Sequence, residues 1–342
     1  MPLFGLLSHS PAVDVVVVLV ATGFIWFGSG WLETSAERLS AYYGLPPVVQ
    51  GSVIVAIGSS FPELSSVVFA ALAGVFDMGV GAIVGSAIFN ILVIPALSGL
   101  ASDRSLESNR TLVYKEAQFY MIAVSVLVVT FALAVIYAPA PDATLVGYIT
   151  RPLAVLPLLL YGLYTFIQWQ DVADSEAASV DDGVPVIRRW LLLAAGLVVI
   201  LLAVEQLVGS VEALSHSFGV PDFLAGVTVV AAATSLPDLI VSVRSARGGN
   251  SLTSLANVFG SNTFDLLVAI PVGVLIIGSV PIDFATAVPM MGVLTLATIL
   301  LFAALRTDLS LSRNEAYLLA LGYLLFVVWV VAETVGVTNL IR

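Results

Sequence analysis

The chain contains no cysteine, only two histidines and a single lysine, Lys115. Without thiols it can form neither disulfides nor thiolate metal sites. Charged residues make up only 10% of its 342 residues, and the acidic ones outnumber the basic ones, giving a net charge of −11. This shortage of basic residues argues against nucleic acid as a partner. An acidic, lysine-poor surface would suit the salt-rich cytoplasm of a halophilic prokaryote.

No basic residue precedes Arg38. The first apolar stretch therefore lacks the basic region of a secretory signal, and we expect it to remain as a helix. Apolar surface is what the chain has in abundance, with 59% hydrophobic residues and a mean hydropathy of +1.07. A soluble fold of this length could not bury that much. The apolar runs are longer than a barrel strand and do not alternate, so the sequence predicts an all-α polytopic membrane protein.

Ten apolar stretches are long enough to cross about 30 Å of hydrocarbon as helices. They lie near residues 13–37, 48–75, 80–101, 117–138, 149–169, 190–215, 223–246, 253–279, 283–305 and 314–336. With these spans, ten basic residues share one side of the membrane: Arg38, Arg104, Arg110, Lys115, Arg188, Arg189, Arg244, Arg247, Arg306 and Arg313. Only Arg151 and Arg342 fall on the other side. The positive-inside rule then predicts a multi-pass protein of the cell membrane with both termini extracellular.

A polar signature occurs twice in the chain, 175 positions apart. Residues 58–63 (GSSFPE) recur as residues 233–238 (ATSLPD), and residues 85–90 (GSAIFN) recur as residues 260–265 (GSNTFD). Each copy belongs to a half with five expected spans, an odd number, so the second half enters the membrane from the opposite side. The sequence therefore predicts two inverted five-helix repeats, 1–169 and 190–342, joined by an acidic cytoplasmic linker at 170–189. Inverted repeats with a site near the bilayer midplane are typical of secondary transporters.

The repeated motifs gather oxygen ligands at interrupted helices. Ser59 and Ser60 lie four and three residues before Glu63, so the three side chains share one helical face. Pro62 between them disrupts the turn and frees backbone carbonyl groups near Gly58. The candidate cation ligands of both copies are Ser59, Ser60, Glu63, Ser86, Asn90, Thr234, Ser235, Asp238, Ser261, Asn262 and Asp265.

All of these ligands are hard oxygens, which suit calcium and sodium rather than zinc, copper or iron. Glu63, Asp238 and Asp265 bring up to three negative charges into the membrane, where each is costly unless a cation neutralises it. Three sodium ions balance these charges, as does one calcium ion together with one potassium ion or one proton. Since either load uses the same carboxylates, the two loads compete, which is what an exchanger requires.

Each of these residues also has a structural explanation. Serine and threonine in membrane helices often bond only to their own backbone, and glycine and proline often only pack or kink. The duplication of a carboxylate beside a proline favours ion binding over structure. Other membrane acids, among them Glu33 and Glu37, are expected to be interfacial charges, with a role on an access path as the less favoured alternative.

The motifs at 58–98 and 233–275 resemble those of the cation/calcium exchanger superfamily, and residues 77–90 (DMGVGAIVGSAIFN) most resemble the potassium-dependent sodium/calcium exchangers. The resemblance implies calcium export driven by inward sodium. It implies that Glu63 and Asp238 hold calcium and share sodium, that Asn90 and Asp265 complete the site, and that Asp265 is associated with potassium. Three departures from the family pattern or from repeat symmetry stand out: Ala233 replaces a usual glycine, Ala87 lies opposite Asn262, and Ala82 lies opposite Asn257.

We therefore expect a secondary antiporter, not an enzyme, that exchanges sodium for calcium by alternating access at a midplane carboxylate site. The transported ions are calcium, sodium and, by resemblance, potassium, and no cofactor is expected. A calcium/proton antiporter on the same fold is the nearest alternative, because protons compete for carboxylates. A passive cation channel is a more distant one. An intramembrane hydrolase is disfavoured, since no Gly-x-Gly-Asp motif is present.

Overall fold

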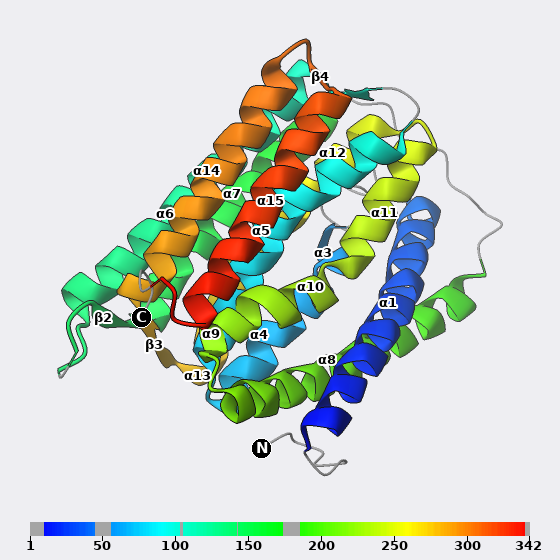
Figure 1. Ribbon diagram of the computed structural model, residues 1–342. Helices are drawn as coiled ribbons and strands as arrows, with labels where there is room; N and C mark the ends of the chain where they lie inside the picture. Colours follow the sequence, from blue (N-terminus) through cyan, green and yellow to red (C-terminus); the bar gives the residue numbers. More distant parts are fainter. Residues whose placement is uncertain (1–9, 45–55, 103–104, 142, 174–184, 339–342) are drawn as a thin grey trace.

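The computed structural model describes residues 10–44, 56–102, 105–141, 143–173 and 185–338. Long helices form nearly all of this part of the chain, with two short two-stranded sheets at the ends of the bundle (Figure 1). The expectation of a helical, polytopic membrane protein is confirmed.

Among the described residues, eight helices are long and apolar enough to cross a membrane, or nine if one bent pair counts as a span. The unbroken ones are α1 (Pro11–Tyr42), α5 (Phe76–Ala101), α6 (Ala117–Tyr137) with its preceding π-helical turn η2 (Leu112–Glu116), α7 (Arg151–Ala173), α8 (Val186–Phe218), α12 (Ser251–Phe264) continuing through η4 (Asp265–Ala269) into α13 (Ile270–Ile277), α14 (Phe284–Arg306) and α15 (Arg313–Thr334). These eight and the bent pair, which covers 222–247, match nine of the ten expected spans. The remaining expected span, 48–75, lies partly outside the described residues. Residues 174–184 of the expected linker also lie outside them.

Two helices are interrupted at the repeated motifs. In the first half, α3 (Ala56–Ser59) stops and α4 (Phe61–Ala73) starts on either side of Ser60. In the second half, α9 (Asp222–Ala225), the π-helical turn η3 (Gly226–Val230) and α10 (Ala231–Thr234) are followed, after Ser235, by α11 (Leu236–Arg247), with a bend of 45°. Pro62 and Pro237 lie in the first turns of α4 and α11, where a missing backbone N–H costs nothing. The predicted interruptions are therefore present in both halves.

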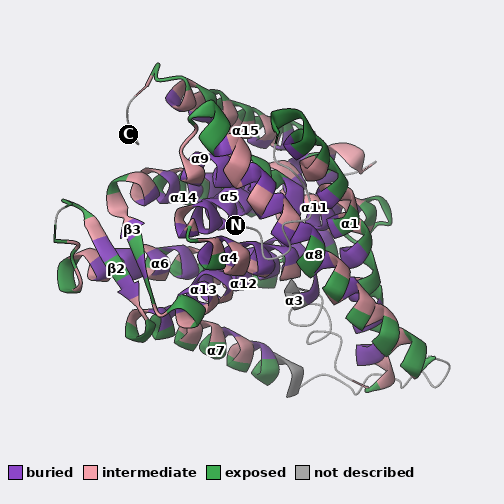
Figure 2. Cartoon of the chain, turned by 90° about the horizontal axis from the view of Figure 1, so that it is seen from below, coloured by how far each residue is buried: buried purple, intermediate pink, exposed green. Residues whose placement is uncertain are grey.

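The helices differ strongly in burial. The apolar window of α5 is 83% buried, whereas that of α7 is only 22% buried, so α5 is central and α7 is peripheral. Seen from below, the central helices are mostly buried and the outer helices expose one side (Figure 2). Together α1 and α8 form a pair of their own, in which Gly28 and Gly196 let the two backbones meet: a Cβ at Gly196 would lie 2.7 Å from the Gly28 carbonyl oxygen. Most of the second apolar cluster comes from these two helices, and residues of the main bundle, among them Ala70, Met78 and Ala82, complete it.

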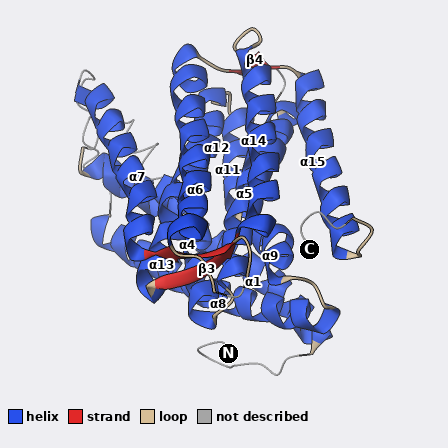
Figure 3. Cartoon of the chain, turned by 90° about the vertical axis from the view of Figure 1, so that its left-hand side faces the viewer, coloured by secondary structure: helices blue, strands red, loops and turns tan. Residues whose placement is uncertain are grey.

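The short strands join the two halves of the chain. Strand β1 (Leu106–Glu107) pairs with β4 (Ser310–Leu311), and β2 (Val146–Thr150) pairs with β3 (Ser279–Asp283), both antiparallel. Each pair links the connection before the fourth span of one half to the connection after the fourth span of the other half. The β2–β3 pair lies at the end of the bundle opposite to β4 (Figures 1 and 3). The main bundle is thus tied at both ends, while neither strand pair includes α1 or α8.

Helix α5 crosses the start of the seventh span at backbone contact. Side chains at Gly81 and Gly85 would collide with the carbonyl groups of Phe223 and Val227, and one at Gly226 would collide with the Met78 carbonyl group. Glycine is therefore required at these positions for the two segments to approach each other. The close crossing leaves no side-chain layer between the first half of α5 and η3.

Candidate cation site

All eleven predicted ligands are buried, and the structure brings them together from both halves. The three carboxylates, Glu63, Asp238 and Asp265, have exposed fractions of 1%, 1% and 0%. The ligands lie in or beside the interrupted helices (Ser59, Ser60 and Glu63; Thr234, Ser235 and Asp238) and on the helices that pack against them (Ser86 and Asn90 on α5; Ser261, Asn262 and Asp265 on α12 and η4). The 175-residue spacing therefore predicted spatial neighbours.

Hydroxyl groups connect the two halves across the site. The Ser86 and Ser235 oxygens are 2.6 Å apart, and Ser235 also lies 3.4 Å from Glu63 Oε1, to which it can donate. On the other side, the Ser59 and Ser261 hydroxyl oxygens are 3.2 Å apart. Each motif's serine thus contacts a serine of the opposite copy.

Asn90 is oriented by two acceptors. Its amide nitrogen donates to Asp238 Oδ2 at 3.3 Å and to Asn262 Oδ1 at 3.0 Å. With the nitrogen held on that side, the Asn90 Oδ1 oxygen points away from both acceptors and meets no donor among the described residues. A buried amide oxygen left in this way is costly unless a cation or water bonds to it.

Two carboxylates likewise keep unsatisfied oxygens. Glu63 Oε2 and both oxygens of Asp265 are buried and meet no donor at bonding distance among the described residues. Glu63 is nevertheless close enough to Asp265 and Asp238 for their charges to act on it, and the Ser60 hydroxyl lies beside Asp265. Several acceptors without donors, grouped in the protein interior, are the arrangement expected around a cation.

Two predicted ligands have an additional structural bond. The Thr234 hydroxyl donates to its own helix, at 3.1 Å from the Val230 oxygen, so only its lone pairs face outward. The Asn262 nitrogen lies 3.2 Å from the Ala87 oxygen, while its own oxygen accepts from Asn90. In this structure Asn262 orients Asn90. Asn262 and Thr234 therefore have a structural role at least in part.

Two residues of the site were absent from the predicted set. Asn257 donates to Asp238 Oδ1 at 3.4 Å and to the Ser242 hydroxyl at 3.2 Å. The Tyr120 hydroxyl lies 3.4 Å from the Asn262 nitrogen. Asn257 had a visible signal, because it is the polar member of a repeat pair whose other member is Ala82. Nothing in the sequence around Tyr120 distinguishes it from a packing residue.

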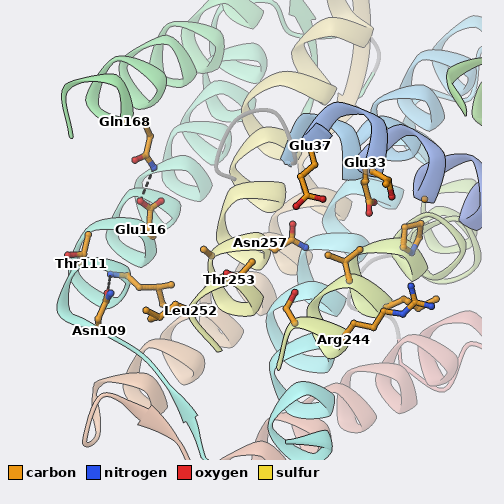
Figure 4. A pocket seen from close by; sticks show the side chains of 18 of the residues that line it. Glu33, Glu37, Asn109, Thr111, Glu116, Gln168, Arg244, Leu252, Thr253 and Asn257 are labelled. Atoms are coloured by element: carbon orange, nitrogen blue, oxygen red, sulfur yellow. Dashed lines mark hydrogen bonds between the residues drawn. The ribbon is translucent and has the colours of Figure 1, made fainter. Parts of the chain in front are cut away.

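A cavity of about 710 Å³ lies beside this site, toward the end of the bundle where α11 ends. Its wall includes Glu33 and Glu37 of α1, Arg244 of α11 and Asn257 of α12 (Figure 4). Because Asn257 is bonded to Asp238, one side chain separates the cavity from a central carboxylate. Helix α11 ends and α15 begins near this end of the bundle, and both carry basic residues there, Arg244, Arg247 and Arg313.

The carboxylates alone do not form a metal cluster. In the part of the chain that the structure describes, no three acidic or histidine side chains are arranged to hold a metal by themselves. A cation at this site must therefore also use hydroxyl, amide or carbonyl oxygens, as hard cations do in adaptable sites. A ligand shell of this mixed kind suits an ion that is bound and released rather than a permanent structural metal.

Comparison with known proteins identifies the family. The family model described as "Sodium/calcium exchanger protein" matches residues 13–170 and 188–332. The chain belongs to the sodium/calcium exchanger family. It is thus a multi-pass membrane transporter of the cation/calcium antiporter kind rather than an enzyme, as the sequence predicted.

Individual relatives agree with this assignment. The chain is similar to the putative antiporter CaxA of Alkalimonas amylolytica, with 29% identity over 90% of this chain and 97% of that protein. It is similar to human sodium/potassium/calcium exchanger 4 at 42% identity, but over only 29% of this chain and 15% of that protein. Its fold is similar to that of the solved sodium-calcium exchanger NCX_Mj, with a TM-score of 0.64, 23% identity, and coverage of 93% of this chain and 99% of the other.

Proposed function

We propose that the protein exchanges sodium for calcium across the membrane, with both ions using the carboxylate site formed by Glu63, Asp238, Asn90 and Asp265. The observation that supports this most directly is the group of buried oxygens on Glu63, Asn90 and Asp265 that meet no hydrogen-bond donor in the described part of the chain. Three carboxylates within the membrane are tolerated when cations neutralise them. Three sodium ions can do so, and so can one calcium ion together with one potassium ion or one proton. Because both loads use the same carboxylates, they exclude each other and their movements are coupled.

The architecture we propose is ten transmembrane helices in two inverted five-helix repeats, with both termini extracellular. The motif spacing, the two interrupted helices and the crosswise pairing of β1 with β4 and β2 with β3 support it. In such a fold the site lies at the repeat interface near the midplane.

Alternating access would come from movement of α1 and α8 against the main bundle. This pair takes part in neither strand pair and is held together by the contact at Gly28 and Gly196. It meets the bundle through an apolar cluster that small residues of the bundle, such as Ala70 and Ala82, share with it. With the basic end of the bundle in the cytoplasm, the cavity beside α1 would open inward. The glycine crossing of α5 and η3 would close the other side in this conformation.

Potassium co-transport is a separate part of the proposal. It is supported by the shared segment with a sodium/potassium/calcium exchanger and by Asp265, whose two oxygens accept no hydrogen bond from the residues that the structure describes. A carboxylate with both oxygens available can hold a monovalent ion beside calcium bound by Glu63 and Asp238.

A calcium/proton antiporter is the rival function on the same fold, and tracer calcium flux in proteoliposomes decides between the two. Sodium, potassium and proton gradients are imposed one at a time. We expect calcium uptake to follow an outward sodium gradient and to persist when the pH gradient is collapsed. Uptake that follows the pH gradient and ignores sodium would overturn the proposed counter-ion, and calcium conduction without any counter-ion would indicate a channel.

A further inference from the structure

Glu33 has a buried carboxylate oxygen that the central site does not use. Its Oε1 atom is buried and meets no hydrogen-bond donor among the described residues. Glu33 lines the cavity and projects from α1 toward it (Figure 4). An unpartnered carboxylate oxygen beside a cavity is costly to hold unless a cation or proton reaches it.

The position of Glu33 places it between the cavity and the central site. The Glu33 carboxylate lies close enough to Asp238, Glu37 and Arg244 for the charges of these three side chains to act on it. Its side chain also passes Gly58, where an added Cβ would lie 3.9 Å from Glu33 Cγ. Gly58 directly precedes Ser59 and Ser60, so Glu33 lies next to the interrupted helix that carries central ligands.

The other carboxylates of the cavity do not compete for this role. Glu116 is already occupied, since it accepts from Tyr164 at 2.9 Å and from Gln168 at 2.8 Å. Glu37 is exposed, one helical turn farther along the same face of α1. Glu33 is therefore the carboxylate that combines cavity access, burial of an oxygen and proximity to Asp238.

We propose that Glu33 forms an access site for hard cations at the inner end of the cavity, one step before the central carboxylates. The inference rests on the proposed cation transport for its purpose, but the binding itself does not depend on sodium coupling. The ion would be calcium or another oxygen-seeking cation that retains part of its water, because among the described cavity residues Glu33 offers the only buried carboxylate oxygen without a donor. By concentrating cations at the mouth of the site, the carboxylate would speed their arrival from this face only.

Terbium luminescence tests the access site without transport. Tb³⁺ is a hard cation that replaces calcium, and Trp26, which also lines the cavity, lies seven residues before Glu33, or about 10 Å along α1. In purified protein we expect luminescence excited through tryptophan, displaced by calcium. It should fall at least about fivefold in Trp26→Phe and in Glu33→Gln, and be retained in Glu33→Asp and in the exposed control Glu107→Gln.

The central-site variant Glu63→Gln separates the two proposals. We expect it to lose calcium transport but to keep the terbium signal, because its access carboxylate is intact. A signal that survives Glu33→Gln, or that disappears equally in Glu63→Gln, would overturn the access site and leave the exchange function standing. Conversely, if the wild-type protein gave the terbium signal but no sodium-driven calcium flux, sodium would be overturned as the counter-ion and the access site would stand.

A transport measurement distinguishes an access role from a structural one. Calcium self-exchange is followed in inside-out and right-side-out vesicles. Glu33→Gln should raise the half-saturating calcium concentration about tenfold on the cavity face and leave it unchanged on the other face. An equal change in the half-saturating concentration on both faces would mean that Glu33 only supports the fold. So would a fall in the maximal rate that saturating calcium on either face does not reverse.

Discussion

At the scale of single residues, the site depends on how donors are distributed. Asn90 directs its only two N–H groups toward Asp238 and Asn262, and its oxygen meets no donor among the described residues, as the proposed cation site requires. The Ser235 hydroxyl can donate to one Glu63 oxygen, and the other meets no donor among the described residues. The lone pairs that remain are those that a cation can use. Replacing the carboxylates with neutral amides should remove the negative charge that attracts the cation.

The first residue-scale prediction concerns the two proposed calcium carboxylates. Glu63→Gln and Asp238→Asn should each reduce sodium-driven calcium flux to background, because a neutral amide neither attracts the cation nor compensates a second charge. Tracer flux in proteoliposomes measures this, with Glu107→Gln, which removes an exposed carboxylate, as the control. Near-normal transport in either variant would contradict its role as a central ligand.

The second residue-scale prediction concerns potassium. If Asp265 holds this ion, Asp265→Asn should make calcium flux independent of potassium while sodium still drives it. The measurement is the initial flux with and without potassium on each side. Should the potassium dependence persist in the variant, the potassium ligand must lie elsewhere.

At the scale of elements, the fold relies on two backbone contacts between helices. Breaks at Ser60 and Ser235 bring the motif carboxylates to helix starts, and the glycines of α5 allow η3 to approach within backbone distance. The α1–α8 pair repeats this solution at Gly28 and Gly196. Helix contacts of this closeness tolerate no added atoms, because neither backbone can yield as a flexible side chain can.

The element-scale prediction is therefore about glycine. Gly85→Ala should destabilise the protein by about 1–3 kcal/mol through overpacking against the Val227 backbone, despite the better helix propensity of alanine. Gly23→Ala is the matched control, since an added Cβ there meets no atom within 4 Å. Thermal unfolding in detergent measures both. A melting temperature of Gly85→Ala equal to that of Gly23→Ala would disprove the tight crossing.

At the scale of the whole molecule, the cavity, the basic helix ends and the two strand pairs give the protein distinct ends. The β1–β4 pair lies at the end that carries Arg110, Arg244 and Arg313, and the β2–β3 pair lies at the end that carries Arg151. If the first end is cytoplasmic, the conformation described here is open inward.

The absence of native cysteine makes this orientation measurable. Single cysteines at two exposed positions, Glu107→Cys beside β4 and Thr144→Cys before β2, should react with a membrane-impermeant thiol reagent from opposite sides. In intact cells we expect Thr144→Cys to react and Glu107→Cys to react only after permeabilisation. The reverse pattern would invert the proposed topology, and labelling of both positions in intact cells would contradict the span assignment between them.

The hydrophobic runs and the 175-residue repeat were enough to predict the described helices, their interruptions and the eleven polar residues that meet in the interior. Burial in a membrane permits little but helices and makes each polar residue conspicuous. The partners of those ligands were beyond such reasoning. Which serine faces which, that Asn262 orients Asn90, that Asn257 and Tyr120 join the network, and that Glu33 looks into a cavity rather than toward the membrane surface all follow from helix rotation and tilt. These angles are fixed by side-chain and backbone packing between segments more than 100 residues apart, and a linear pattern carries no record of that packing.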